Sequence, residues 1–257
     1  MFYLFYLGKY PIKTYWVIFG VAFLFGFFPF LLQAQKIGLS KKKIFFFYLG
    51  EVISVSLGAR LFYLLLNQPQ IIFKEPSKIF AFSQIYWQGG VSVYGGVWGG
   101  FLFLLFFSFK YKISFWRLAD CVTLSLILGL TFMRLGCFFN GCCYGKPAYI
   151  PWAIVFNNPL VIAPKNIPLH PVQLYEAIPN FFSFFYFLKQ KPKFLGEIIL
   201  KYAIFYNLLR IIVEFFKHPS FHYKNTPFTF PQVLAFFFLI ISLILYKIKY
   251  KWIEDIK

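Results

Sequence analysis

The sequence predicts an all-α fold, a polytopic integral membrane protein with about seven transmembrane helices. Three observations favour it. The 257 residues are 60% hydrophobic and only 13% charged, whereas soluble domains carry about 25% charged residues. Forty phenylalanines and 18 tyrosines suit a bundle that faces lipid. The lysines fall in short clusters between apolar runs of about 20 residues, the length that crosses a bilayer.

Seven segments are apolar enough to form such helices, and the fifth and seventh are the shortest. No soluble domain, linker or internal repeat is visible between them, so we expect a single transmembrane domain over residues 1–257. The expected spans are Tyr15–Ala34, Ile44–Leu66, Gly90–Phe109, Leu118–Phe139, Val172–Leu188, Phe194–Phe216 and Pro231–Tyr246.

Lysine and arginine are shared unevenly between alternate loops, which predicts the orientation. The loops after the first, third and fifth spans and the C-terminal tail carry three or four each, and the other segments carry two each. We therefore place the N-terminus outside and the C-terminus in the cytoplasm, with extracytoplasmic segments near 67–88 and 140–169. Met1–Leu7 is too short for the apolar core of a signal peptide, so we expect no cleavage there.

The net charge of +18 is explained by the membrane. Basic clusters that flank apolar spans are attracted to anionic lipid, so we expect membrane lipid, and no nucleic acid, as a partner. The prolines of segment 140–169 predict irregular backbone. Its aromatic residues Trp152 and Phe156 are typical of the outer lipid interface.

Ionisable residues inside a span cost about 2.5 to 3.5 kcal/mol each at the bilayer centre, so each needs a partner or a wet cavity. The four-residue spacing of Glu197 and Lys201 predicts an ion pair along one helix face. Arg210 and Glu214 have the same spacing. The ionisable residues of the spans are Glu51, Arg60, Asp120, Arg134, Glu176, Glu197, Lys201, Arg210 and Glu214.

Arg134 and Arg210 both lie near the outer ends of their spans, so they can meet at one depth. Tyr202 and Tyr206 precede Arg210 by two turns and one turn, and this polar stripe is expected to face the interior. Two interpretations stay open. An anion such as phosphate could lie between the guanidinium groups, or the arginines could pair internally with Glu176, Glu214 or Asp120.

Two further stretches carry unusual residues. The third span begins with "GGVSVYGGVWGG", whose glycines four apart let another backbone or a ligand come very close; Tyr94 is the one side chain there that could exchange a proton. Cys137, Cys142 and Cys143 do not match zinc-binding spacings. We expect no metal, and favour small buried residues or an extracytoplasmic disulfide. No nucleotide-binding motif is present, so we expect no cofactor.

Three stretches, taken together, resemble the prolipoprotein diacylglyceryl transferase family of bacterial membrane enzymes. "MRLGCFFNGCCYGKP" resembles the family signature G-R-x-G-N-F-x-N-G-E-x-W-G. "HPVQLYEA" resembles H-P-x-Q-L-Y-E-A, and "YNLLRIIVEFFKHP" resembles Y-x-x-x-R-x-x-V-E-F-F-R-x-P. Their order and spacing cover nearly the whole chain. The matching polar and glycine residues are Arg134, Gly136, Asn140, Gly141, Gly145, His170, Gln173, Tyr175, Glu176, Tyr206, Arg210 and Glu214.

The resemblance implies a reaction and its partners. The diacylglyceryl group of phosphatidylglycerol would move to the lipobox cysteine thiol of a prolipoprotein signal peptide, forming a thioether and releasing glycerol phosphate. The location implied is the bacterial cytoplasmic (inner) membrane, as a multi-pass protein. Arg134 and Arg210 would hold the phosphodiester. The remaining site residues implied are Tyr94, His170 and Tyr206 as catalytic and Asn140, Gly145, Arg60, Tyr15, Gln173, Glu176 and Glu214 as substrate-binding, with Gly145 leaving room for the head group.

Three departures from the family pattern bear on the chemistry. Tyr94 stands where the family has a histidine, and Cys137 and Cys142 replace an asparagine and the glutamate of the signature. Tyr94 and His170 are the candidates for the acid or base of the reaction, and a nearby cation that favours the thiolate is the alternative to a base. Two other functions stay open: a lipid-binding paralogue that has lost catalysis or changed its specificity, and a transporter of anionic solutes in which the arginines line a path.

Overall fold

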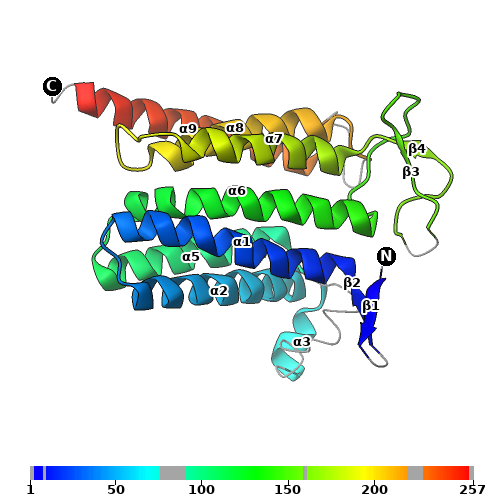
Figure 1. Cartoon of the computed structure of the whole chain (residues 1–257), viewed down its shortest axis with the longest axis horizontal. Helices are drawn as coiled ribbons and strands as arrows, with labels where there is room; N and C mark the ends of the chain where they lie inside the picture. The colour runs from blue at the N-terminus through cyan, green and yellow to red at the C-terminus, as the bar shows by residue number, and fades with distance from the viewer. Residues whose placement is uncertain (1–2, 8–9, 76–90, 159–160, 219–227, 255–257) are drawn as a thin grey trace. The chain divides into compact units, whose positions relative to one another are not determined.

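The computed structural model describes residues 3–7, 10–75, 91–158, 161–218 and 228–254, and within them the chain is mostly helical (Figure 1). The chain divides into two compact units, one of Met1–Phe30 with Asp120–Lys257 and the other of Leu31–Ala119. The helices are α1 Thr14–Lys36, α2 Lys41–Asn67, α3 Pro69–Lys74, α5 Val93–Tyr111, α6 Phe115–Asn140, α7 Val172–Leu188, α8 Glu197–Glu214 and α9 Phe230–Glu254.

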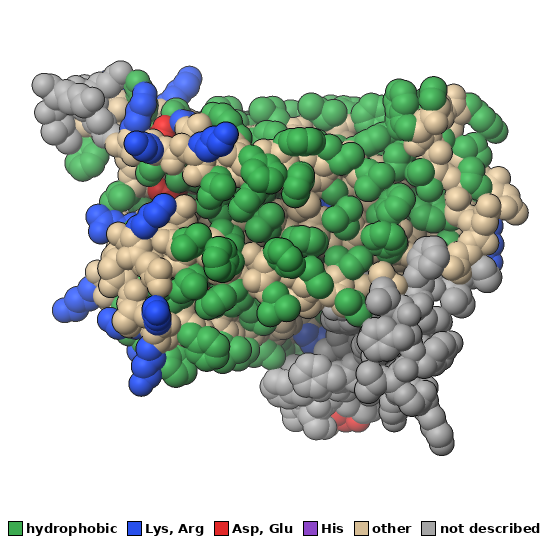
Figure 2. All heavy atoms as spheres, in the orientation of Figure 1, with side chains coloured by type: hydrophobic (Ala, Val, Ile, Leu, Met, Phe, Trp, Pro, Cys, Tyr) green, Lys and Arg blue, Asp and Glu red, His purple; other side chains and the backbone are tan. Residues whose placement is uncertain are grey.

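Every segment expected to span the membrane forms a helix, and α7 has the bounds that the sequence predicts. Five helices, α1, α2, α5, α6 and α9, are long and apolar enough to cross a membrane. Helix α7 has 17 residues, one short of the 18 required of such a helix. Helix α8 carries four charged side chains, more than the two that are allowed. Large hydrophobic side chains cover much of the helix surface (Figure 2). The chain is therefore a helical, multi-pass membrane protein.

The described residues also contain two short antiparallel strand pairs that the all-α prediction did not include. β1 (Tyr3–Leu7) pairs with β2 (Tyr10–Lys13), and β3 (Ile154–Val155) pairs with β4 (Pro168–Leu169). Strands of two to five residues are too short to show a periodic apolar pattern. Most of the segment expected at 67–88, and Gly90, the first residue of the third expected span, lie outside the described residues; α3 occupies part of 67–88.

In the unit of Leu31–Ala119, α2 and α5 pack through their glycines. A Cβ atom on Gly95 would overlap the carbonyl of Gly58, and one on Gly99 would overlap the carbonyl of Ser54. The glycines thus let the two backbones come into direct contact. Of the two roles that the glycine spacing allows, the structure shows packing against another backbone.

In the other unit, α7 and α9 both pack against α8, and the three helices lie side by side (Figure 1). The interior contains the buried side chain of Tyr202 together with Leu124, Ile127 and Phe187. Asp120 caps the start of α8, because its carboxylate accepts hydrogen bonds from the backbone N–H of Gly196 (2.7 Å) and of Ile199 (3.0 Å). The Asp120 carboxylate therefore serves α8 and not the two arginines.

Segment 140–169 is largely irregular, as the prolines predict, and it packs closely. Phe156 and Leu169 are buried in one apolar cluster. Phe156 therefore faces the protein interior, and of the two aromatic residues expected at the lipid interface it is Trp152, 60% exposed, that presents its ring outward. The backbone N–H of Ala148 donates to the carbonyl of Pro168 at 2.9 Å, which ties the two ends of the segment together.

Candidate active site

Arg134 and Arg210 meet at the carboxylate of Glu176. Arg134 Nη2 lies 2.8 Å from Glu176 Oε2, and Arg210 Nη1 lies 2.6 Å from Glu176 Oε1. The three side chains come from α6, α8 and α7, so residues far apart in sequence converge. The structure thus brings the two arginines together and shows internal pairing with Glu176, one of the two interpretations that the sequence left open.

The cluster extends to a second carboxylate and a third cation. Arg210 Nη2 lies 2.8 Å from Glu214 Oε2, so the predicted pair four residues apart is confirmed, and Lys217 Nζ lies 3.8 Å from the same oxygen. The five side chains, which we call the arginine cluster, are Arg134, Glu176, Arg210, Glu214 and Lys217; none is more than 14% exposed. With three cations and two carboxylates, the cluster carries one net positive charge.

Hydrogen bonds between α7 and α8 position Glu176 within the arginine cluster. The Tyr202 hydroxyl donates to Asn180 Oδ1 at 2.8 Å, and the Asn180 amide donates to the backbone carbonyl of Glu176 at 2.8 Å. The rings of Tyr202 and Tyr206 lie 6.0 Å apart. The polar stripe along α8 therefore faces the interior, as predicted. The sequence analysis did not single out Asn180. An asparagine within an apolar helix, four residues after Glu176, could have indicated it, because a buried amide needs hydrogen-bond partners.

Two residues at the start of α9 support Glu214. The Thr229 hydroxyl donates to Glu214 Oε1 at 3.2 Å, and the side chain of Gln232, 2% exposed, accepts from the backbone N–H of Thr229 at 2.9 Å. Neither residue was singled out in the sequence. Their signal is that of an N-terminal cap, a threonine with a glutamine three residues later.

His170 precedes α7, and its ring lies against those of Tyr175 and Phe216. Its Nδ1 lies 3.0 Å from the Tyr175 hydroxyl, which accepts a hydrogen bond from Trp152 Nε1 at 2.8 Å. Because the indole N–H can only donate, the Tyr175 hydroxyl still has its own hydrogen, which it can donate to Nδ1 of His170 when that nitrogen carries no proton. Partial burial, and then the charge of Lys146, hold the pKa of His170 below its ordinary value of 6.5. A neutral His170 can accept a proton.

Gly145 packs against the protein's own backbone, and its role beside the head group stays a prediction. A Cβ atom at Gly145 would lie 2.5 Å from the His170 carbonyl oxygen and 2.8 Å from that of Phe216. The backbone N–H of Gly145 also donates to the His170 carbonyl at 3.2 Å. The missing side chain therefore makes room for the protein's own backbone.

Gln173 and Asn140 flank the loop that follows α6. The Gln173 amide donates to the backbone carbonyl of Cys142 at 2.7 Å, while its Oε1 atom is buried and accepts no hydrogen bond from the residues that the structure describes. The backbone carbonyl of Asn140 accepts from the N–H of Ile162 at 3.4 Å. Gln173 thus keeps one acceptor free for a hydroxyl donor.

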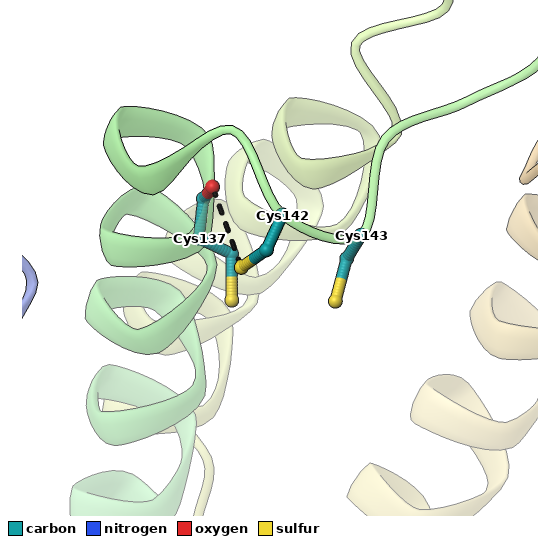
Figure 3. A group of neighbouring side chains, drawn as sticks. All are labelled: Cys137, Cys142 and Cys143. Atoms are coloured by element: carbon teal, nitrogen blue, oxygen red, sulfur yellow. Dashed lines mark hydrogen bonds between the residues drawn. The ribbon is translucent and has the colours of Figure 1, made fainter. Parts of the chain in front are cut away.

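The three cysteines of this loop lie together. The Sγ atoms of Cys137, Cys142 and Cys143 are all within 4.8 Å of one another, and Figure 3 shows them at the end of α6. All four cysteines of the chain are free thiols. Hydrogen bonds from the other two thiols lower the pKa of Cys143, and the positive charges of Arg134 and Lys217 lower it further.

Three predicted site residues are not joined to the arginine cluster by the structure. Arg60 and Tyr94 belong to the unit of Leu31–Ala119, where Arg60 is buried with its guanidinium 6.0 Å from the Tyr63 ring and Tyr94 is 40% exposed. Tyr15 lies in α1, and its side chain is outside the described residues. Their placement in one site with the arginines stays a prediction.

Most of the chain matches known proteins. The family model described as prolipoprotein diacylglyceryl transferase matches residues 2–248. The chain is similar to proteins named phosphatidylglycerol–prolipoprotein diacylglyceryl transferase. One from Geobacter sulfurreducens is 31% identical over 90% of this chain and 88% of its own length. One from Bordetella avium is 32% identical over 82% of this chain and 80% of its own.

A third relative, from Bordetella parapertussis, is 33% identical over 66% of this chain, and the match spans 63% of that protein's length. The family model reaches nearly from end to end of the chain. It includes the arginine cluster, the cysteine loop and His170. The chain therefore belongs to the prolipoprotein diacylglyceryl transferase family.

Proposed function

We propose that this protein transfers the diacylglyceryl group of phosphatidylglycerol to the lipobox cysteine thiol of prolipoproteins. Family membership supports the reaction, and the names of the relatives supply both substrates. The observation that carries the proposal is the meeting of Arg134 and Arg210, from two distant helices, in a buried cluster with a net positive charge.

The charge and the free hydrogen-bonding groups of the cluster suit a phosphodiester. One net positive charge is balanced by the single negative charge of a phosphodiester, and burying an unbalanced charge in a membrane protein is costly. Arg134 Nε is buried and has no hydrogen-bond partner among the described residues. The guanidinium therefore retains a donor for a phosphate oxygen, and Gln173 Oε1 retains an acceptor for a glycerol hydroxyl.

The transfer forms one bond and breaks one. The lipobox sulfur bonds to the glyceryl carbon of the lipid, the bond from that carbon to the phosphate oxygen breaks, and glycerol phosphate leaves. In this proposal Arg134 and Arg210 stabilise the charge that develops on the leaving phosphate, and Tyr206 lines the same face of α8. The thiol proton passes to a base, because the thiolate is the nucleophile. His170 and Tyr94 are the candidates for that base.

The remaining roles follow from the same proposal. Asn140, Gln173, Glu176 and Glu214 orient the head group, and Arg60 and Tyr15 complete the substrate site from elsewhere in the chain. The protein crosses the bacterial inner membrane seven times, with α7 and α8 as two of the spans, the N-terminus outside and the C-terminus in the cytoplasm. Prolipoprotein signal peptides reach the site from the bilayer.

The proposal is tested by supplying the purified protein with phosphatidylglycerol and a lipobox peptide and detecting the thioether product by mass spectrometry. Arg134→Ala and Arg210→Ala are each expected to reduce transfer by about 100-fold or more, because loss of a donor to transition-state charge costs about 2.7 to 4 kcal/mol. Product from the unchanged protein is required for the proposal to stand.

Lys201→Ala is the matched control. Lys201 and Glu197 form an ion pair of 2.7 Å on α8 with the same four-residue spacing as Arg210 and Glu214. The control removes a cation from the same helix and is expected to keep transfer close to that of the unchanged protein. Full transfer by Arg134→Ala would remove Arg134 from the site, and a folded protein that binds the lipid without making product would be the paralogue that has lost catalysis.

A further inference from the structure

Three thiols lie close together in the loop that follows α6, and the proposed transfer uses none of them. Cys137 is on the last turn of the helix and is buried, Cys142 is partly buried, and Cys143 is exposed. All three Sγ atoms are within 4.8 Å of one another. In a tetrahedral zinc site with Zn–S distances of about 2.3 Å, sulfur atoms lie about 3.8 Å apart. Small rotations of the side chains would bring the three sulfurs to that spacing.

The end of α6 explains how residues five apart in sequence meet. Gly141 has a φ of +65° and lets the chain reverse direction, so the backbone N–H of Cys142 donates to the carbonyl of Cys137 at 3.1 Å. This is the hydrogen bond of a glycine-terminated helix. Cys143 follows with a φ of +57°, an uncommon conformation for a residue other than glycine. The Cys142 thiol points back toward Cys137 (Figure 3).

The loop is held from both sides. The Gln173 amide donates to the Cys142 carbonyl at 2.7 Å. Beyond the cysteines, Gly145 donates to His170 at 3.2 Å and Lys146 donates to Phe216 at 2.8 Å through backbone groups. A loop fixed on each side holds its side chains in place before an ion arrives, which lowers the entropic cost of binding.

The surrounding charge suits three thiolates and a divalent ion. Such a site carries one net negative charge, and the neighbouring arginine cluster carries one net positive charge. Thiolate ligands select soft ions such as Zn²⁺ and Cu⁺ over Mg²⁺ and Ca²⁺. The exposure of Cys143 gives the ion a route of entry, and a small ligand such as water would take the fourth position.

We propose that Cys137, Cys142 and Cys143 form a binding site for one thiophilic metal ion, with Zn²⁺ as the ion that fits the three-sulfur geometry. Each thiol loses its proton on binding, so up to three protons are released per ion. The ion would clamp the end of α6 to the loop that carries Gly145. The site goes beyond the proposed transfer reaction and does not depend on it.

The test uses the full chain in detergent micelles, reduced with a phosphine that contains no thiol. Titration with Cd²⁺ is expected to give sulfur-to-metal charge-transfer absorption that saturates at one ion per chain. In a separate titration with Zn²⁺ alone, elemental analysis should find one zinc per chain, and Cd²⁺, the softer ion, should displace it and restore the band.

Variants assign the ligands. Replacing Cys137, Cys142 and Cys143 together with serine is expected to remove both the absorption band and the bound zinc, and each single replacement should weaken them. Cys121→Ser is the matched control, because Cys121 is a buried cysteine of the same helix outside the cluster, and it should bind as the unchanged protein does. Zinc should raise the melting temperature of the control and not of the triple variant.

Three results would overturn the site. They are the absence of a charge-transfer band in the reduced protein, an unchanged band in the triple variant, and a Cys137–Cys142 disulfide in the isolated protein that gives no metal uptake after reduction. Alkylation of the unchanged protein supplies a measurement that needs no variant. Zn²⁺ should protect Cys143 from a maleimide reagent, and equal labelling with and without zinc would count against the proposal.

Discussion

The carboxylate of Glu176 decides how the two arginines can act. Without it, two buried guanidinium groups would repel each other, and the interaction would be strong in a medium of low dielectric constant. Glu176 contacts both Arg134 and Arg210 and is 2% exposed. Under the proposed function, a substrate phosphate would meet two cations that Glu176 already positions, and would balance the one net positive charge of the arginine cluster.

His170 provides a prediction at the same scale. Its pKa is lowered by partial burial and by Lys146, so nuclear magnetic resonance of histidine-labelled protein should find a value below 6.5. Because a lowered pKa favours the neutral form, His170 should stay neutral to a lower pH than a free histidine, and its contribution to stability should be full above pH 6.5 and fall as pH decreases through the lowered value.

Two lysine variants separate the causes of this shift. Lys146→Met is expected to move the pKa of His170 upward toward 6.5, whereas Lys165→Met, at an exposed position of the same outer segment, should leave it unchanged. His170→Gln identifies the resonance among the three histidines. A pKa of 6.5 or higher in the unchanged protein would contradict the structure.

At the scale of elements, the apolar pattern predicted all seven long helices, and the structure shows what several of them pack against. The spacing of Gly95 and Gly99 predicted a close approach on α5, and the partner is α2 through Gly58 and Ser54. Helix pairs of this kind depend on small residues, because contact between backbones replaces contact between side chains.

Matched glycine substitutions should change stability in opposite directions. A Cβ at Gly99 would overlap the backbone of α2, so Gly99→Ala is expected to lower the free energy of unfolding by about 1 to 3 kcal/mol. Nothing lies within 4 Å of a Cβ at Gly129 on α6, so Gly129→Ala should raise it by about 0.5 to 1 kcal/mol, the usual gain for alanine in a helix. Denaturant titration in mixed micelles measures both, and equal effects would refute the packing of α2 on α5.

At the scale of the whole molecule, the proposed orientation can be measured directly. In a variant with all four cysteines replaced by serine, Tyr149→Cys should react with a membrane-impermeable maleimide added to intact spheroplasts, because Tyr149 is 95% exposed in the segment placed outside. Lys251→Cys, in the C-terminal part of α9, should react only after the membrane is permeabilised. The reverse pattern would invert the proposed topology.

The sequence by itself determined the helical class, the helices and the residues of the arginine cluster other than Lys217, because lipid imposes a minimum length on each span and makes every ionisable side chain conspicuous. Lys217 follows Glu214 by three residues, a signal that was present and not used. The short strand pairs have too few residues to show a periodic apolar pattern.

Only the tertiary structure decided that Glu176 contacts both arginines, that Asp120 caps α8 and that the three cysteines of the loop lie close together. These contacts depend on the rotation and depth of helices that are distant in sequence and on the reversal of the chain after α6, and periodicity along a single segment carries no information on either.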